Sequence, residues 1–288
     1  MQSSFISRWQ DYWIRVCNFC CDYRGDPLNF YASIGNTSNA RERAFIEHEL
    51  RDARAAGDKV YMLGHIPPGV INTDVISWNA LRNWTQWYSN IADEFSDVIA
   101  AHFAGHTHKD EKRIFKGHNG SAAAVAHVLP SVTTQINRNP SVMQFKYDRA
   151  TFELLDYTVF YSNVTRANAD GFFTFTPFYS ALEYYGLADL SAASWQRLFE
   201  DMRCDRGLFD KYLKANSACI LERALPSFRL QKMHSLFFVL FLLIIFAQAY
   251  YSGFDHPCDA GCMRHHICAT TQLQLDDWTR CMNNETVV

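Results

Sequence analysis

The amino-acid sequence predicts a mixed α/β (α+β) fold, in which helices lie outside one or more sheets. Helical and strand patterns alternate along the 288-residue chain, 48% of its residues are hydrophobic, and its net charge is only −3. This length and apolar content are sufficient for a full hydrophobic core. The small net charge provides no basic surface of the kind that binds nucleic-acid polymers, so we exclude that class of partner.

The individual elements follow from the spacing of apolar residues. A helix is predicted at 38–57, because apolar residues recur on one face and Gly57 ends the pattern. The predicted strands are 59–65, 97–106, 112–117, 123–131, 141–148 and 151–161, and the further helices are 78–95, 181–202 and 206–216. A short Asp-Arg-Ala turn joins the last two strands as a hairpin. Residues 1–37 show no sustained periodicity and are expected to be irregular.

The cysteines and sequons concern the compartment of the protein. Four of the nine cysteines lie together near the C-terminus, and such a set forms disulfides in a secreted protein or binds zinc in a cytosolic one. Five Asn-x-Ser/Thr sequons favour secretion and are predicted glycosylation sites: Asn36, Asn83, Asn119, Asn163 and Asn284. The first 21 residues contain no secretory signal peptide. Either the protein stays inside the cell or its start lies upstream.

Histidines follow glycine at the ends of two predicted strands. His106 and His108 lie in "AGHTH", where alternate residues of an extended chain point the same way, and His65 lies in "GHIPPG". Imidazole is a natural ligand for zinc and similar divalent metals. We therefore expect a metal site at this sheet edge, and the alternative is a set of surface loop histidines.

Other polar residues near these motifs have competing interpretations. Asp110 and Glu111 are expected either to orient the metal-binding loop from the outer layer of the site or to form a solvated acidic pair. His102 lies in an apolar run and is expected to be a hydrogen-bonded core histidine. His265 and His266 lie within the cysteine-rich tail and are expected at the surface.

Three stretches together resemble one known family. "GHIPPG" and "FAGHTHKDE" resemble the last two metal-binding motifs of the calcineurin-like metallophosphoesterases, in the form found in acid sphingomyelinases and acid sphingomyelinase-like phosphodiesterases. The tail "CDAGCMRHHICATTQLQLDDWTRC" resembles the four-cysteine pattern of that family's C-terminal domain. The resemblance covers about residues 38–216 and 256–282, and the absence of a cysteine just after "GHIPPG" favours the sphingomyelinase-like branch.

The resemblance implies a fold. Residues 38–162 would form the C-terminal half of a metallophosphoesterase β-sandwich flanked by helices, and 163–288 a helical, disulfide-stapled C-terminal domain. The implied disulfides are Cys258–Cys262 and Cys268–Cys281. The family's chemistry implies two zinc ions, a substrate that is a sphingomyelin-type lipid or a nucleotide phosphodiester, and a secreted or lysosomal location. A membrane surface is a further expected partner, and the oligomeric state is not predicted.

The resemblance also assigns the histidines, with His65 and His106 binding the second zinc and His108 the first. The family's upstream motifs, Asp-x-His and Gly-Asn-His, do not occur in these 288 residues. We therefore expect a fragment of an enzyme with no catalytic residue that can be assigned with certainty and with little activity of its own. The alternative is a non-catalytic, membrane-anchored glycoprotein that keeps the fold.

One segment interrupts the resemblance at about 219–248. Its apolar run at 236–247 would span about 18 Å as a helix, short of the roughly 30 Å of a bilayer core. We interpret it as a translated intron, because Phe, Leu, Val and Ile codons share a central thymine and the following Ala-Gln matches a CAG acceptor site. The true chain would then join near Ala218 to near Ala249. A membrane anchor is the alternative.

Overall fold

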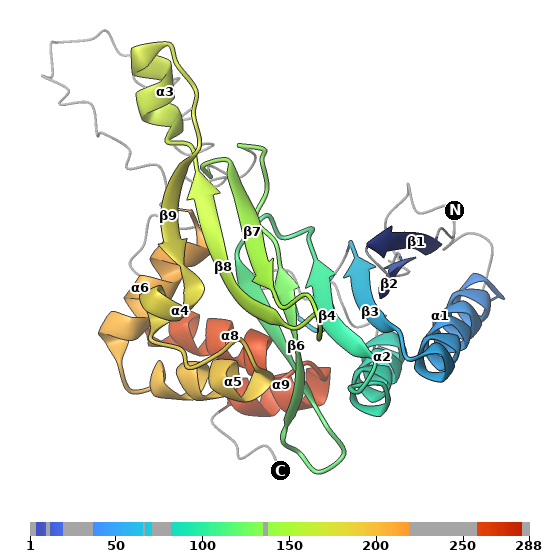
Figure 1. Ribbon diagram of the computed structural model, residues 1–288. Coiled ribbons are helices and arrows are strands. Elements are labelled where there is room, and N and C mark those ends of the chain that lie inside the picture. Colours follow the sequence, from blue (N-terminus) through green and yellow to red (C-terminus); the bar gives the residue numbers. More distant parts are fainter. Residues whose placement is uncertain are drawn as a thin grey trace, which may run out of the picture.

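The computed structural model describes residues 4–9, 12–19, 37–65, 67–70, 82–134, 138–218 and 258–283. Within these residues, two sheets carry helices against their outer sides, so the expected α/β class is confirmed (Figure 1). The large sheet has the strand order β1-β2-β3-β4-β6-β5, and the small sheet has the order β7-β8-β9.

The large sheet is built mainly from parallel strands. Strands β2, β3, β4 and β6 run parallel, whereas β1 and β5 lie antiparallel at its edges. Its strands are β1 (Ser4–Trp9), β2 (Tyr12–Phe19), β3 (Lys59–Gly64), β4 (Ile99–Ala104), β5 (Glu111–Lys116) and β6 (Ala122–Val128). Strands β1 and β2 correct the expectation that residues 1–37 are irregular. Strand β2 pairs with β3, which is distant in sequence. This pairing stabilises segments that are too short to show a repeating pattern of apolar residues.

The small sheet covers one face of the large sheet. It consists of β7 (Ser141–Tyr147), β8 (Leu154–Tyr161) and β9 (Thr176–Ser180), and the predicted hairpin of β7 and β8 is confirmed. Phe103 of β4 contacts Phe145 of β7 with ring centroids 5.0 Å apart, and His127 of β6 contacts Tyr157 of β8 at 5.9 Å. These contacts join the sheets face to face, as a sandwich requires. Strand β9 lies beyond residue 163, where the sequence predicts only helices.

Two helices cover the opposite face of the large sheet (Figure 1). They are α1 (Thr37–Ala56) and α2 (Arg82–Glu94), close to the predicted ranges. Leu50 of α1, Ile91 of α2 and Val60 of β3 are buried in one apolar core. The apolar face that predicts the first helix is therefore the face that packs on the sheet.

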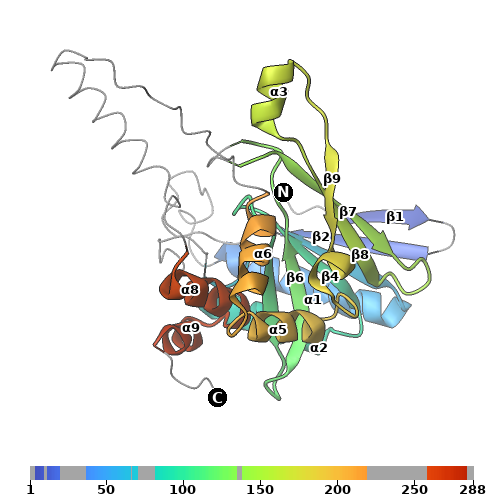
Figure 2. The same ribbon diagram turned by 90° about the vertical axis from the view of Figure 1, so that its left-hand side faces the viewer.

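The remaining helices form a group beside the sandwich (Figure 2). They are α4 (Ala181–Tyr185), α5 (Ala192–Asp201), α6 (Arg206–Asn216), α8 (Ala260–Thr271) and α9 (Leu275–Met282), while α3 (Val164–Asp170) stands apart. The disulfides are Cys258–Cys262 and Cys268–Cys281, the pairing that the resemblance implies. Ile267 of α8 shares one core with Trp195 of α5, so the disulfide-bonded helices pack on the preceding ones.

Some predictions fall outside the described residues. The apolar segment at about 219–248 lies there, as do Asn36 and Asn284, so the intron, the membrane anchor and these two glycosylation sites stay predictions. Among the helices that the structure does describe, none combines the length and the apolar character needed to cross a membrane.

Candidate metal centre

The ends of β3 and β4 bring His65 and His106 together. The two strands are parallel neighbours, and the His65 carbonyl oxygen accepts a hydrogen bond from the Gly105 amide at 2.9 Å. His65 Nε2 lies 3.3 Å from His106 Nδ1, and the rings are nearly perpendicular. Both residues are exposed. This sheet edge therefore presents two neighbouring imidazole nitrogens to the outside of the protein.

His108 lies two residues further along the same loop. Its Nδ1 lies 3.5 Å from Thr133 Oγ1, which belongs to the loop after β6. Burial lowers the pKa of His108, and the charges of Arg138 and His65 lower it further, which favours the neutral form that binds metals. His106 and His108 have φ angles of 69° and 57°. Such left-handed backbone is uncommon outside glycine, costs of order 1–3 kcal/mol and clusters at functional sites.

The spacing of the two histidine nitrogens allows either a hydrogen bond between the rings or a shared zinc ion. Two nitrogens bound tetrahedrally at about 2.0–2.1 Å from the ion lie roughly 3.3–3.4 Å apart, and the His65 and His106 nitrogens lie 3.3 Å apart. His108 does not belong to the same tight set. Within the described ranges, the one group of three potential ligand atoms all within 4.8 Å is Cys258, Cys262 and His266. The two cysteines form a disulfide, so that group has no thiolates to offer a metal.

The five charged residues at 109–113, directly after the second histidine motif, are all buried. Each exposes 3% or less of its surface. The ion pairs are Lys112–Asp110, Arg113–Glu111 at 2.8 Å and Lys109–Glu111 at 3.9 Å. The expectation that Asp110 and Glu111 form a solvated acidic pair is therefore wrong. Opposite charges brought in by the same short segment compensate their burial.

Asp110 connects the histidine loop to the rest of the fold. Its carboxylate accepts hydrogen bonds from the hydroxyls of Tyr157, at 3.2 Å, and Tyr179. Its carbonyl oxygen accepts a hydrogen bond from the Asn216 side chain at 3.0 Å. Burial and the negative charge of Asp110 raise the pKa of both tyrosines well above the ordinary value, so both remain donors. The chain just after His108 is thus tied to the small sheet and to α6.

Glu111 and Arg138 complete this buried network. Burial alone would raise the pKa of Glu111, but the charges of Arg113 and Lys109 outweigh burial and hold it at about 2. Arg138 is 9% exposed, and burial lowers its pKa to about 10 while Glu111 opposes that change. Sequence reasoning missed Arg138, because a charged residue in a loop is normally a solvated one. It also missed the exposed Thr133, because no motif marks that residue.

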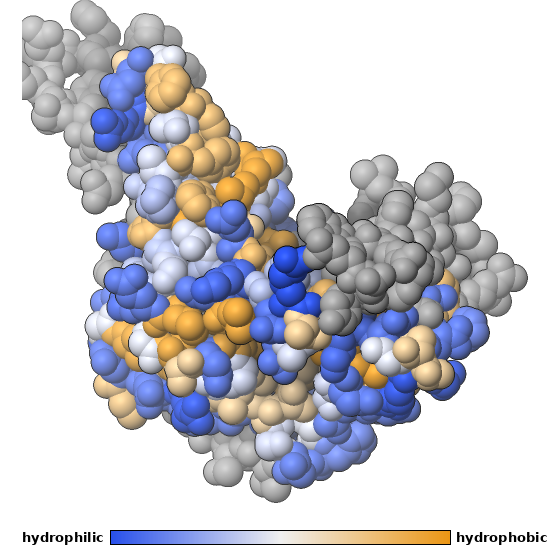
Figure 3. Space-filling model, viewed as in Figure 1, coloured by the Kyte–Doolittle hydropathy of each residue, from blue (hydrophilic) through white to orange (hydrophobic). Residues whose placement is uncertain are grey.

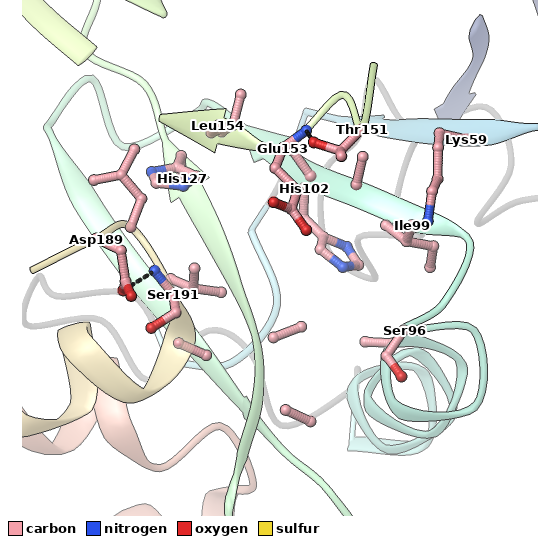
Figure 4. A pocket seen from close by; sticks show the side chains of 18 residues that line it. Lys59, Ser96, Ile99, His102, His127, Thr151, Glu153, Leu154, Asp189 and Ser191 are labelled. Carbon is pink, nitrogen blue, oxygen red and sulfur yellow. Dashed lines mark hydrogen bonds between the residues drawn. The ribbon is translucent and has the colours of Figure 1, made fainter. Parts of the chain in front are cut away.

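A cavity of about 390 Å³ lies away from the histidine pair, toward the starts of β4 and β6 (Figure 4). His102 and His127 line it together with Asp189 and Ser191 at the start of α5. His102 is buried, and its Nδ1 lies 2.9 Å from the Tyr88 hydroxyl, which confirms the expected core histidine. Burial lowers the pKa of His102 to about 3. Its ring is therefore neutral and structural.

The expectation of a surface position is wrong for His266. This residue is 2% exposed and contacts the rings of Phe209 and Tyr212. Burial lowers its pKa to about 3. Its neighbour His265 is half-buried against Trp278. Adjacent residues of a helix point in different directions, so only one of the two histidines of α8 faces the core. The sequence of the tail does not indicate which one.

Comparison with known proteins shows sequence similarity to one group of phosphodiesterases. Residues 120–219 match the family described as "Acid sphingomyelin phosphodiesterase C-terminal region". The chain is 33% identical to the sphingomyelin phosphodiesterase of Homo sapiens over 68% of this chain and 30% of that protein. It is 28% identical to the acid sphingomyelinase-like phosphodiesterase 3b of Homo sapiens, over 83% of this chain and 47% of that protein. It is 26% identical to a cyclic GMP-AMP phosphodiesterase of Rattus norvegicus, over 87% of this chain and 51% of that protein.

The chain belongs to the acid sphingomyelinase-like phosphodiesterase family and carries its C-terminal part, as the motifs indicate. It spans about a third to a half of the length of the curated relatives it matches. The matched region 120–219 holds the small sheet and helices α3 to α6, whereas the histidine pair precedes it.

Proposed function

We propose that this chain forms the C-terminal half of the metal site of a zinc-dependent phosphodiester hydrolase. The observation that carries the proposal is the His65–His106 pair, whose nitrogens lie 3.3 Å apart where two parallel strands end. Ligand sites of α/β sheets commonly lie at this edge. Membership of a phosphodiesterase family supplies the reaction class.

Each histidine has a proposed role. His65 and His106 would hold one zinc ion and His108 the other, with Asp110 positioning the loop between them and the core. Bound zinc supplies a Lewis acid for the phosphoryl oxygens and a means of activating water near neutral pH. The chain's own contribution is to hold His108 neutral by burial and to keep the His65 and His106 nitrogens in register.

The same proposal limits what these 288 residues do alone. They contain neither Asp-x-His nor Gly-Asn-His, the motifs that in the resembled family supply the bridging aspartate and further histidines. Three histidines without a bridging carboxylate hold two divalent cations poorly, because the repulsion between the cations is not compensated. We therefore propose weak zinc binding and little turnover by this chain alone.

The proposed substrate is a phosphodiester, either a sphingomyelin-type lipid or a nucleotide. Relatives named as sphingomyelin phosphodiesterases support the lipid, and a relative named as a cyclic GMP-AMP phosphodiesterase supports the nucleotide. A secreted or lysosomal glycoprotein is the proposed context. Asn119 and Asn163 are exposed in the structure, which a glycan acceptor requires, and Asn83 lies in α2.

Zinc titration tests the site. We expect His106→Ala to weaken zinc binding by at least about tenfold, because it removes one of two ligands of the same ion. The matched control is His48→Ala, an exposed histidine of α1, which should leave the affinity unchanged. Equal affinities of wild type and His106→Ala would contradict the proposal and favour the non-catalytic glycoprotein. A different result would be that the chain hydrolyses a phosphodiester and loses this activity in His106→Ala. That result would contradict the proposal that activity requires metal ligands beyond the three histidines.

A further inference from the structure

A projection rises from the small sheet and ends in exposed aromatic side chains. It consists of α3 (Val164–Asp170) and the segment that leads into β9 (Figure 1). No residue of α3 is buried. Phe172 and Phe173, at the turn after α3, are 69% and 53% exposed, and Phe175 is 37% exposed. We call these three phenylalanines the aromatic tip. Much of their apolar surface is exposed to solvent, and they do not belong to the hydrophobic core.

The described residues of the projection carry no net charge. Residues 171–178, "GFFTFTPF", contain no charged side chain. The two charges of α3, Arg166 and Asp170, pair with each other at 3.2 Å. Figure 3 shows the projection polar along one side and apolar along the other. Within the described part of the projection no unbalanced charge is available to a charged partner, so its exposed phenylalanines favour an apolar contact.

The base of the projection is bonded to the connection between β6 and β7, which also contacts the histidine loop. The Asn139 carboxamide oxygen accepts a hydrogen bond from the Val164 amide at the start of α3. Asn139 belongs to the same connection between β6 and β7 as Thr133, which contacts His108. Val132, next to Thr133 in the sequence, is 62% exposed, so this connection carries a further exposed apolar side chain.

We propose that the aromatic tip inserts into the surface of a lipid bilayer and brings the histidine edge to it. The tip is convex, and a convex apolar point is accommodated by a fluid interface without a pocket shaped to receive it. Phenylalanines without neighbouring charge suit that interface better than an exposed position in water. The inference rests in part on the proposed function, because a lipid phosphodiester is presented at a bilayer surface.

Vesicle binding tests the inference without any turnover. We expect the chain to sediment with neutral phosphatidylcholine–sphingomyelin vesicles, and Phe172→Ser/Phe173→Ser/Phe175→Ser to lower that affinity by at least about tenfold. High salt should not weaken binding, since the contact is uncharged. The matched control is Tyr147→Ser/Leu155→Ser, which removes exposed apolar groups near the opposite end of the β7–β8 hairpin.

The outcomes separate the alternatives. Binding that the triple variant retains, or that the control loses equally, overturns the inference. So does a concentration-dependent dimer that the triple variant abolishes, since the tip would then be covered by a second copy of the chain. A melting temperature equal to wild type shows that the variant is folded, as expected for exposed substitutions. Absent vesicle binding with intact zinc binding would overturn this inference and leave the proposed function standing.

Discussion

Replacing Glu111 by glutamine tests whether the buried charges of the histidine loop stabilise the fold. Glu111 is completely buried, and its carboxylate lies 2.8 Å from Arg113 and 3.9 Å from Lys109. Glutamine keeps the size of the side chain and removes its charge. Two buried cations would then face a neutral amide. Removing one partner of a buried ion pair is strongly destabilising, because the remaining charge is not compensated.

The magnitude follows from the pKa of Glu111. A fall from an ordinary value of 4.5 to about 2 in the folded protein corresponds to about 3 kcal/mol at neutral pH. Losing one partner of a buried pair costs roughly 3–5 kcal/mol, in agreement. The pKa of Glu111 is lower in the folded than in the unfolded protein. This contribution to stability is therefore present above pH 4.5 and disappears as the pH falls toward 2. About half of it should remain near pH 3.

Urea unfolding at a series of pH values measures the effect. We expect the free energy of unfolding of Glu111→Gln to lie about 3 kcal/mol below wild type at pH 7, with the difference halved near pH 3. The control is Glu153→Gln, at an exposed residue just before β8, which should change stability little. A deficit for Glu111→Gln that is equally large at both pH values would refute the electrostatic reasoning, because only a packing defect is independent of protonation.

Two further changes probe the supports of the same loop. Cys268→Ser opens a disulfide between cysteines 13 residues apart and should lower stability by about 3 kcal/mol in non-reducing thermal unfolding; Cys204→Ser, at an exposed free thiol, should not. Tyr179→Phe removes a hydrogen bond to the Asp110 carboxylate and should cost about 2 kcal/mol in urea unfolding. Tyr161→Phe removes the hydroxyl of a half-buried tyrosine of the same sheet, and an equal loss there would show that the cost is not specific to the Asp110 hydrogen bond.

Much of the fold could be predicted from local patterns. The helix expected at 38–57 is α1 (Thr37–Ala56), and the strands that deliver the histidines are β3 (Lys59–Gly64) and β4 (Ile99–Ala104). These elements have a continuous apolar face, so packing and periodicity agree. The first two strands were missed because their pairing partner is remote in sequence. Strand β9 was missed because its partner β8 decides its conformation.

The candidate site was predictable where a motif ends a strand, and not where burial depends on distant residues. His65 and His106 meet because parallel neighbours end at one edge, which the sequence pattern indicates. Asp110 and Glu111 look like a solvated acidic pair in the sequence, and only Tyr157, Tyr179 and other residues of later elements make them part of a buried network. A charge of this kind is recognised from its partners, not from its own neighbours in sequence.

The disulfide-bonded helices support the histidine edge directly, although about 150 to 200 residues separate them from it in sequence. Gly69, four residues after His65, approaches Leu273 so closely that a Cβ at Gly69 would lie 2.9 Å from the leucine Cδ2. Val70 belongs to the same small core as Cys268 and Trp278. The segment after His65 therefore rests on the C-terminal helices, while Asp110 fastens the segment after His106 to α6. Both strands of the candidate metal centre are held from the C-terminal side, so the disulfide-bonded region is part of the site's framework and not an appendage to it.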